Sequence, residues 1–132
     1  MSNKLDKILA EISAGELFDK ITILEIKKEK ISNNEKLADV EKELSSLKNT
    51  VEKFIPNQSN ISKHVNDLKE INLKLWDIED GKRAAEKEKK FDDKFIELAR
   101  NVYKLNDERA KIKLAINTCL LYTSDAADEW IG

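Results

Sequence analysis

The stretch FDDKFIELARNVYKLNDERAKIKLAI, residues 91–116, decides the fold of this chain. Its apolar residues recur at alternating steps of four and three, the spacing of one face of a long α-helix: Phe91, Phe95, Leu98, Val102, Leu105, Ile112 and Ile116. Only Arg109 interrupts this seam, and Asp92 is a good N-cap for the helix. Roughly 27 residues at 1.5 Å each predict a helix of about 40 Å.

Three more helices are expected before this stretch. Ser13 with Glu16, and Ser32 with Glu35, have the spacing of capping boxes, which predicts helices over residues 14–31 and from the second box to about residue 54. Residues 55–60 hold the only proline and form the clearest loop. A third helix should begin near Ile61 and fray or end within residues 81–90, which are almost wholly polar.

These elements predict an all-α fold, because no β-type alternation, glycine-rich phosphate loop or internal repeat is present. The second helix has a strict heptad seam, formed by Leu37, Val40, Leu44, Leu47, Val51 and Phe54. We therefore expect elongated antiparallel helical hairpins in a four-helix bundle with coiled-coil-like seams. Unpartnered seam surface would favour a homo-oligomer or a protein partner.

Composition narrows the class of protein. Charged residues make up 38% of the chain, with 3 glycines and 1 proline, as in long helices. The net charge of −2 gives no strongly basic field, so no nucleic-acid partner is expected. No apolar run approaches 18 residues and no signal-peptide pattern is present, which predicts a cytoplasmic protein without a membrane partner. The lone Cys119 argues against disulfides and thiolate metal sites, so no metal is expected and no cofactor is indicated.

The C-terminal run, residues 119–132, has a different character. Its first eleven residues resemble an in-frame translation of a transposase-type sequencing adapter, which back-translation can reproduce letter for letter. We therefore expect a single domain over residues 1–118 and a non-native tail over residues 119–132, as in a truncated environmental reading frame. Without this tail the net charge changes from −2 to +1. Residues from Cys119 onward should then pack poorly, and Cys119, Tyr122 and Trp130 should have no functional role.

One polar residue enters the apolar stripe of each of three helices: Lys28, Asn72 and Arg109. If the last two helices turn near residues 90 and 91, opposed residue numbers should sum to roughly 181, which places Asn72 level with Arg109. Two interpretations follow: the layer fixes register, with Asp19, Glu25 or Asp107 as a counter-charge, or it binds a phosphate or carboxylate ligand. Both interpretations remain open from the sequence alone.

Two further clusters are candidate binding residues. Trp76, Asp77 and Asp80 combine an aromatic ring with carboxylates that share one helix face and that could hold Mg²⁺, although the acid pairs of a nucleotide pyrophosphohydrolase are not assembled. The second cluster lies around Arg109 on the last helix and consists of Arg100, Tyr103, Asn106 and Asp107. An acidic helix face paired with lysine and arginine is the commoner explanation of the first cluster, and an ordinary hydrogen-bonded helix surface is the alternative for the second.

Three segments together resemble DUF6165, a family of small bacterial and phage proteins of unknown function. They are GELFDKITILEIK from Gly15, LWDIED from Leu75, and FIELARNVY followed by NDERAKIK from Phe95. The resemblance covers nearly all of residues 14–117 in the right order. It implies no established reaction, cofactor or catalytic residue, so whether the chain is an enzyme stays open.

The sequence thus favours a helical interaction or assembly protein. The alternative is a binding protein or enzyme acting on an anionic small molecule, a nucleotide or sugar phosphate, through the polar layer.

Overall fold

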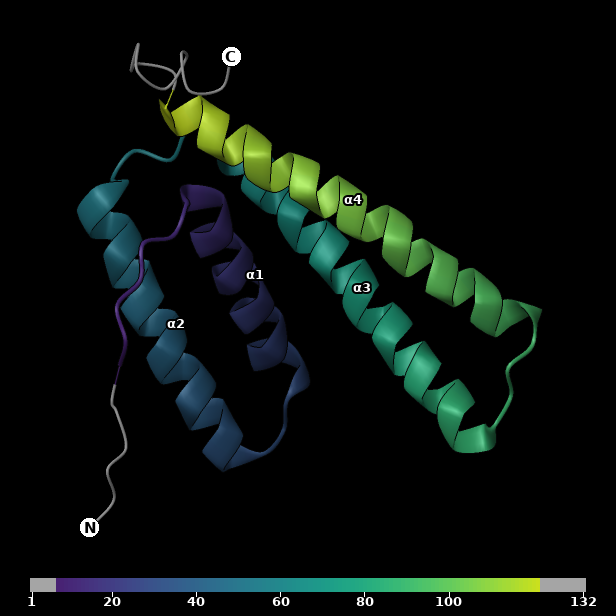
Figure 1. Ribbon diagram of the computed structural model, residues 1–132. Coiled ribbons are helices and arrows are strands. Elements are labelled where there is room, and N and C mark those ends of the chain that lie inside the picture. The colour runs from purple at the N-terminus through teal and green to yellow at the C-terminus, as the bar shows by residue number, and fades with distance from the viewer. Residues whose placement is uncertain (1–6, 122–132) are drawn as a thin grey trace.

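The computed structural model describes residues 7–121, which form four α-helices and no strand (Figure 1). The helices are α1 (Ala14–Lys30), α2 (Asn34–Phe54), α3 (Ser62–Glu88) and α4 (Asp93–Leu121). The predicted all-α class and the antiparallel pairing of α3 with α4 are confirmed. The third helix ends within the decade expected of it, at Glu88.

Side-chain caps begin three of the helices. The Ser13 hydroxyl accepts a hydrogen bond from the Glu16 amide at 3.2 Å, and the Asp92 carboxylate accepts one from the Phe95 amide at 3.3 Å. Both caps are as predicted. The prediction of a Ser32 capping box is wrong by one residue. Asn33 takes the cap position of α2, and its Oδ1 accepts a hydrogen bond from the Lys36 amide at 3.1 Å. Asparagine caps a helix as well as serine does.

Helix α1 lies at the centre of the arrangement. It packs against α2 on one side and against both α3 and α4 on the other, while α2 packs mainly against α1 (Figure 1). Two faces of α1 are therefore buried. Leu17, Ile21 and Leu24 occupy one face and join the core cluster, whereas Gly15, Asp19, Thr22 and Ile26 lie on the opposite face.

Helices α3 and α4 continue well beyond α1 as a two-helix extension (Figure 1). Leu68 and Ile116 are fully buried at its base, yet no side chain between residues 73 and 115 is fully buried. We call residues 73–108 the α3–α4 arm. Gly81 faces Leu98 across the arm, close to the predicted register, since a Cβ at Gly81 would lie 3.2 Å from Leu98 Cδ1.

The end of α4 corrects one expectation. Packing was predicted to stop at Cys119, but α4 continues to Leu121 and the side chains of Cys119 and Leu120 pack against the core. Both residues lie three to four positions after Ile116, so they extend the apolar face of the helix whatever their origin. Residues 122–132, including Tyr122 and Trp130, lie outside the described residues.

Candidate functional site

A buried carboxylate organises the region where α1 packs against α3 and α4, which we call the base of the molecule. Asp19 of α1 is 3% exposed and faces Arg109 of α4. The Arg109 guanidinium donates from Nε to Asp19 Oδ1 at 2.9 Å and from Nη2 to Asp19 Oδ2. This two-point pairing fixes the guanidinium in one orientation, which a lysine ammonium could not reproduce.

Helix α3 completes the layer through Asn72. Its side-chain amide donates to Asp19 Oδ1 at 3.0 Å and to Thr22 Oγ1 at 2.9 Å. The Thr22 hydroxyl in turn donates to the main-chain carbonyl of Asp19 at 2.9 Å. Every buried side-chain nitrogen and oxygen in the described part of the chain has a hydrogen-bond partner. We call Asp19, Thr22, Asn72 and Arg109 the polar layer.

The first turn of α1 is held tightly against α4. The Gly15 amide donates to Asn117 Oδ1 at 2.7 Å, and Lys113 pairs with Glu16 while its Nζ lies 4.0 Å from Asp19 Oδ2. Glycine is required at position 15 because a Cβ there would overlap the main-chain carbonyl of Lys113, 2.9 Å from its carbon. Main chain therefore meets main chain beside the polar layer.

The electrostatics of the layer favour the ionised pair. Burial disfavours the charged carboxylate of Asp19, but hydrogen bonds from Arg109 and Asn72 and the charges of Arg109 and Lys113 lower its pKa below the usual value. The hydrogen bond to Asp19 raises the pKa of Arg109. Asp19 and Glu16 thus balance Arg109 and Lys113, and the layer needs no external anion for charge balance.

The predicted layer is correct for Asn72 and Arg109 and wrong for Lys28. Lys28 is exposed and takes no part in the layer, because it follows the Leu17–Ile21–Leu24 face of α1 rather than the opposite face that meets α3 and α4. Asp19 was named only as one of three possible partners. The sequence reasoning did not single out Thr22, Gly15, Lys113 or Asn117, although a glycine in the first turn of a helix is a usable signal of close packing.

A small pocket of about 180 Å³ lies beside the layer. Trp76, Asn72 and Arg109, all predicted as binding residues, line it together with Arg83 and Glu79. The volume is below the usual range of about 300–1,000 Å³ for small-molecule sites. The pocket nevertheless brings two arginines and a tryptophan together.

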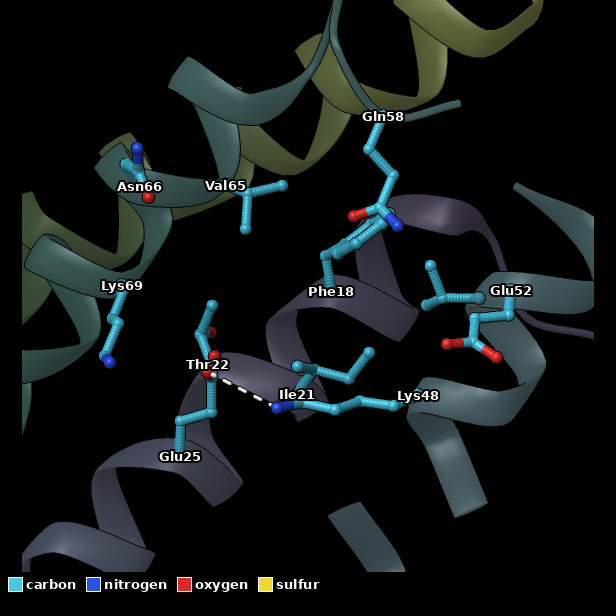
Figure 2. Close-up of a pocket in the computed structure, with 11 residues that line it drawn as sticks. Phe18, Ile21, Thr22, Glu25, Lys48, Glu52, Gln58, Val65, Asn66 and Lys69 are labelled. Atoms are coloured by element: carbon cyan, nitrogen blue, oxygen red, sulfur yellow. Dashed lines mark ion pairs between the residues drawn. The ribbon is translucent and has the colours of Figure 1, made fainter. Parts of the chain in front are cut away.

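A larger groove of about 370 Å³ lies between α2 and α3, which both pack on α1 (Figure 2). Buried Phe18 and Ile21 form part of its floor. Its rim bears charges of both signs, and the lysines there have acidic neighbours. Lys48 Nζ lies 4.0 Å from Glu25 Oε2, and Lys69 Nζ lies 3.2 Å from Glu29 Oε1. Sequence reasoning did not identify this groove, which depends on how α2 and α3 diverge over α1.

The predicted acidic cluster does not join the polar layer. Asp77 and Asp80 are exposed on the α3–α4 arm. Asp80 Oδ1 lies 3.5 Å from Nη1 of Arg83 on the same helix. Within residues 7–121, no group of three or more His, Cys, Asp or Glu side chains is placed to hold a metal ion. None of the described helices has the length and apolar character needed to cross a membrane.

The predicted cluster on α4 divides between two sides of the helix. Asn106 Oδ1 accepts a 3.3 Å hydrogen bond from Arg109 Nη1, so it adjoins the polar layer. The others lie on the side of α4 that faces away from α3, in a row of exposed residues spaced by three or four. We call this row the outer stripe: Ile96, Ala99, Arg100, Tyr103, Asp107, Ala110 and Leu114.

The outer stripe exposes large apolar side chains. Ile96 is 46% exposed, Tyr103 72% and Leu114 60%. Ile96, Ala99 and Tyr103 also line a shallow, mostly apolar depression on α4. Isolated exposed apolar residues are ordinary, but a regular row along one helix face has the pattern of a helix-pairing surface.

Residues 8–124 match DUF6165, which is described as a family of unknown function. The chain belongs to DUF6165. The match includes the polar layer, the α3–α4 arm and the outer stripe, and it confirms the resemblance found in the sequence. Comparisons with curated proteins and with solved structures give no match.

Proposed function

We propose that this DUF6165 protein is an assembly module that forms a dimer of identical chains through the outer stripe of α4. The observation that supports it is the row of exposed residues on α4 in which Ile96, Tyr103 and Leu114 are large apolar side chains. The inner seam of the same helix is already occupied by α3 and α1. A second apolar face has no packing role within the described chain, so a second helix would remove it from water.

The arm gives the same proposal a second support. Within residues 73–108 no side chain of its two helices is fully buried. A two-helix element of this kind gains the burial that it lacks when it pairs with another helix. The charges on the outer stripe, one arginine and one aspartate, permit association without net repulsion.

Sedimentation-velocity measurements over a wide range of protein concentration test the proposal. The Cys119→Ser chain serves as the reference, since it cannot form disulfide-linked dimers. We expect a concentration-dependent dimer, and we expect Tyr103→Glu to shift the dissociation constant by at least about tenfold. Phe54→Glu is the matched control, because Phe54 is 68% exposed but lies on α2, away from the stripe. A single monomeric species at every concentration would overturn the proposal.

A second candidate function is the binding of an anionic small molecule, a nucleotide or sugar phosphate, in the pocket beside the polar layer. What favours it is the convergence of Trp76, Arg83 and Arg109 on that pocket. It ranks second because Asp19 already pairs with Arg109 and the pocket is small.

A thermal-shift screen with nucleotides and sugar phosphates tests this second candidate. A ligand that stabilises the protein should lose its effect in Arg83→Gln and keep it in Arg100→Gln, since Arg100 lies on the outer stripe. Arg83 is the better probe than Arg109, whose loss would disturb the fold itself. The absence of any stabilising ligand would count against this candidate and leave the assembly proposal unaffected.

A further inference from the structure

We propose that the two copies of α4 pair antiparallel, with Leu105 of one chain level with Leu105 of the other. This inference rests on the proposed dimerisation and specifies its geometry. A symmetric pair of this kind uses the same surface on both chains, as most homodimers do. The spacing of the outer stripe and the identity of its residues together select the orientation.

The ends of the stripe set the register. Ile96 and Leu114 both lie nine residues from Leu105, on opposite sides of it. In an antiparallel pair centred there, Ile96 of each chain is level with Leu114 of the second copy, about 13 Å from the centre. The two largest aliphatic residues of the stripe would then cover each other at both ends of the interface.

The residues between these ends are complementary in size. In the same register Arg100 is level with Ala110 of the second copy, so the small side chain leaves space for the aliphatic stem of the arginine. Tyr103 is level with Asp107 of the second copy, a pairing in which the phenol can donate to the carboxylate. Each pair occurs twice because of the two-fold symmetry.

Charge disfavours the parallel alternative. With the chains parallel and in register, Arg100 would face Arg100 and Asp107 would face Asp107, and like charges opposite each other are unfavourable. In the antiparallel pair Arg100 lies one helical turn from Asp107 of the second copy, within reach of its long side chain. Opposite charges therefore meet at two symmetric positions.

Disulfide trapping in the Cys119→Ser background tests the orientation. Chains with Ile96→Cys and chains with Leu114→Cys are oxidised separately and as a mixture, under conditions where sedimentation shows a dimer. We expect a cross-linked dimer in the mixture and little in either variant alone. Efficient cross-linking of Ile96→Cys with itself would show a parallel pair and overturn the inference, while the dimer itself would stand.

Charge reversal gives an independent readout. We expect Arg100→Asp to weaken the dimer about tenfold, and the double variant Arg100→Asp with Asp107→Arg to recover most of that loss. If the double variant is as weak as the two single changes combined, the antiparallel pairing is wrong. If the reference chain itself sediments as a monomer, the failure belongs to the proposed function and removes the inference with it.

Discussion

Helix α4 meets two different environments along its length. Around Arg109 it packs on α1 as well as α3, and its one charged seam residue is fixed by a buried carboxylate. In the arm no side chain is fully buried, and the comparable ion pair, Asp80 with Arg83, lies on the surface within a single helix. The comparison teaches that the base of the molecule is specified by contacts between three helices, whereas the arm depends on one helix pair and on any partner that it binds.

The sharpest test of this contrast is to remove one acid from each ion pair. Asp19→Ala leaves Arg109 without its partner in a partly buried site, and we expect it to lower the free energy of unfolding by about 3–5 kcal/mol. Asp80→Ala should change it by less than about 1 kcal/mol, because both partners there are exposed. Urea denaturation measures both values. Similar losses in the two variants would contradict the contrast between base and arm.

The two helical glycines provide a second test, with effects of opposite sign. Gly15→Ala places a Cβ against the main chain of Lys113, so we expect a loss of about 1–3 kcal/mol in spite of the better helix propensity of alanine. Gly81→Ala meets only the end of the Leu98 side chain, which can rotate, and should stabilise the protein by about 0.5 kcal/mol. Thermal unfolding of both variants checks the signs. A stabilised Gly15→Ala chain would show that α1 and α4 can separate without cost.

The smallest expected effect concerns pH. Because the pKa of Asp19 is lower in the folded state than its ordinary value of 3.8, the ionised pair contributes its full stability above that value and loses it progressively as the pH falls below it. The stability difference between the unsubstituted chain and Asp19→Asn should therefore shrink on acidification from neutral pH to about pH 3. Thr22→Val, a change in the same layer that removes no ionisable group, should keep a constant difference.

Much of this comparison could be predicted from the sequence. The seam of α4 and the turn near residue 90 placed Asn72 level with Arg109, because antiparallel helices with a short connection have a fixed register. Lys28 was placed wrongly because a heptad seam describes a helix with one buried face, and α1 has two. Asp19 and Thr22 lie on the second face, whose burial depends on where α3 and α4 pack.

Some residues of the outer stripe were assigned to the wrong side of α4 for a different reason. Its residues are visible in the sequence, and three of the candidate binding residues, Arg100, Tyr103 and Asp107, belong to it. Their spacing was interpreted as a cluster around Arg109, since a sequence does not state which side of a helix its neighbours will occupy. Only the packing of α3 against α4 separates Asn106, beside Arg109, from the exposed row.

The pairing of Asp19 with Arg109 also has a consequence for the order of folding. The two residues are 90 positions apart, so on the ribosome α1 waits for its charged partner until most of the chain has been made. The α1–α2 hairpin is complete before α3 and α4 are made, while closure of the polar layer joins residues far apart in the sequence and comes late. Asp19 is thus among the last residues to gain its partners, and a newly made chain exposes the Asp19 face of α1 until α4 has been made.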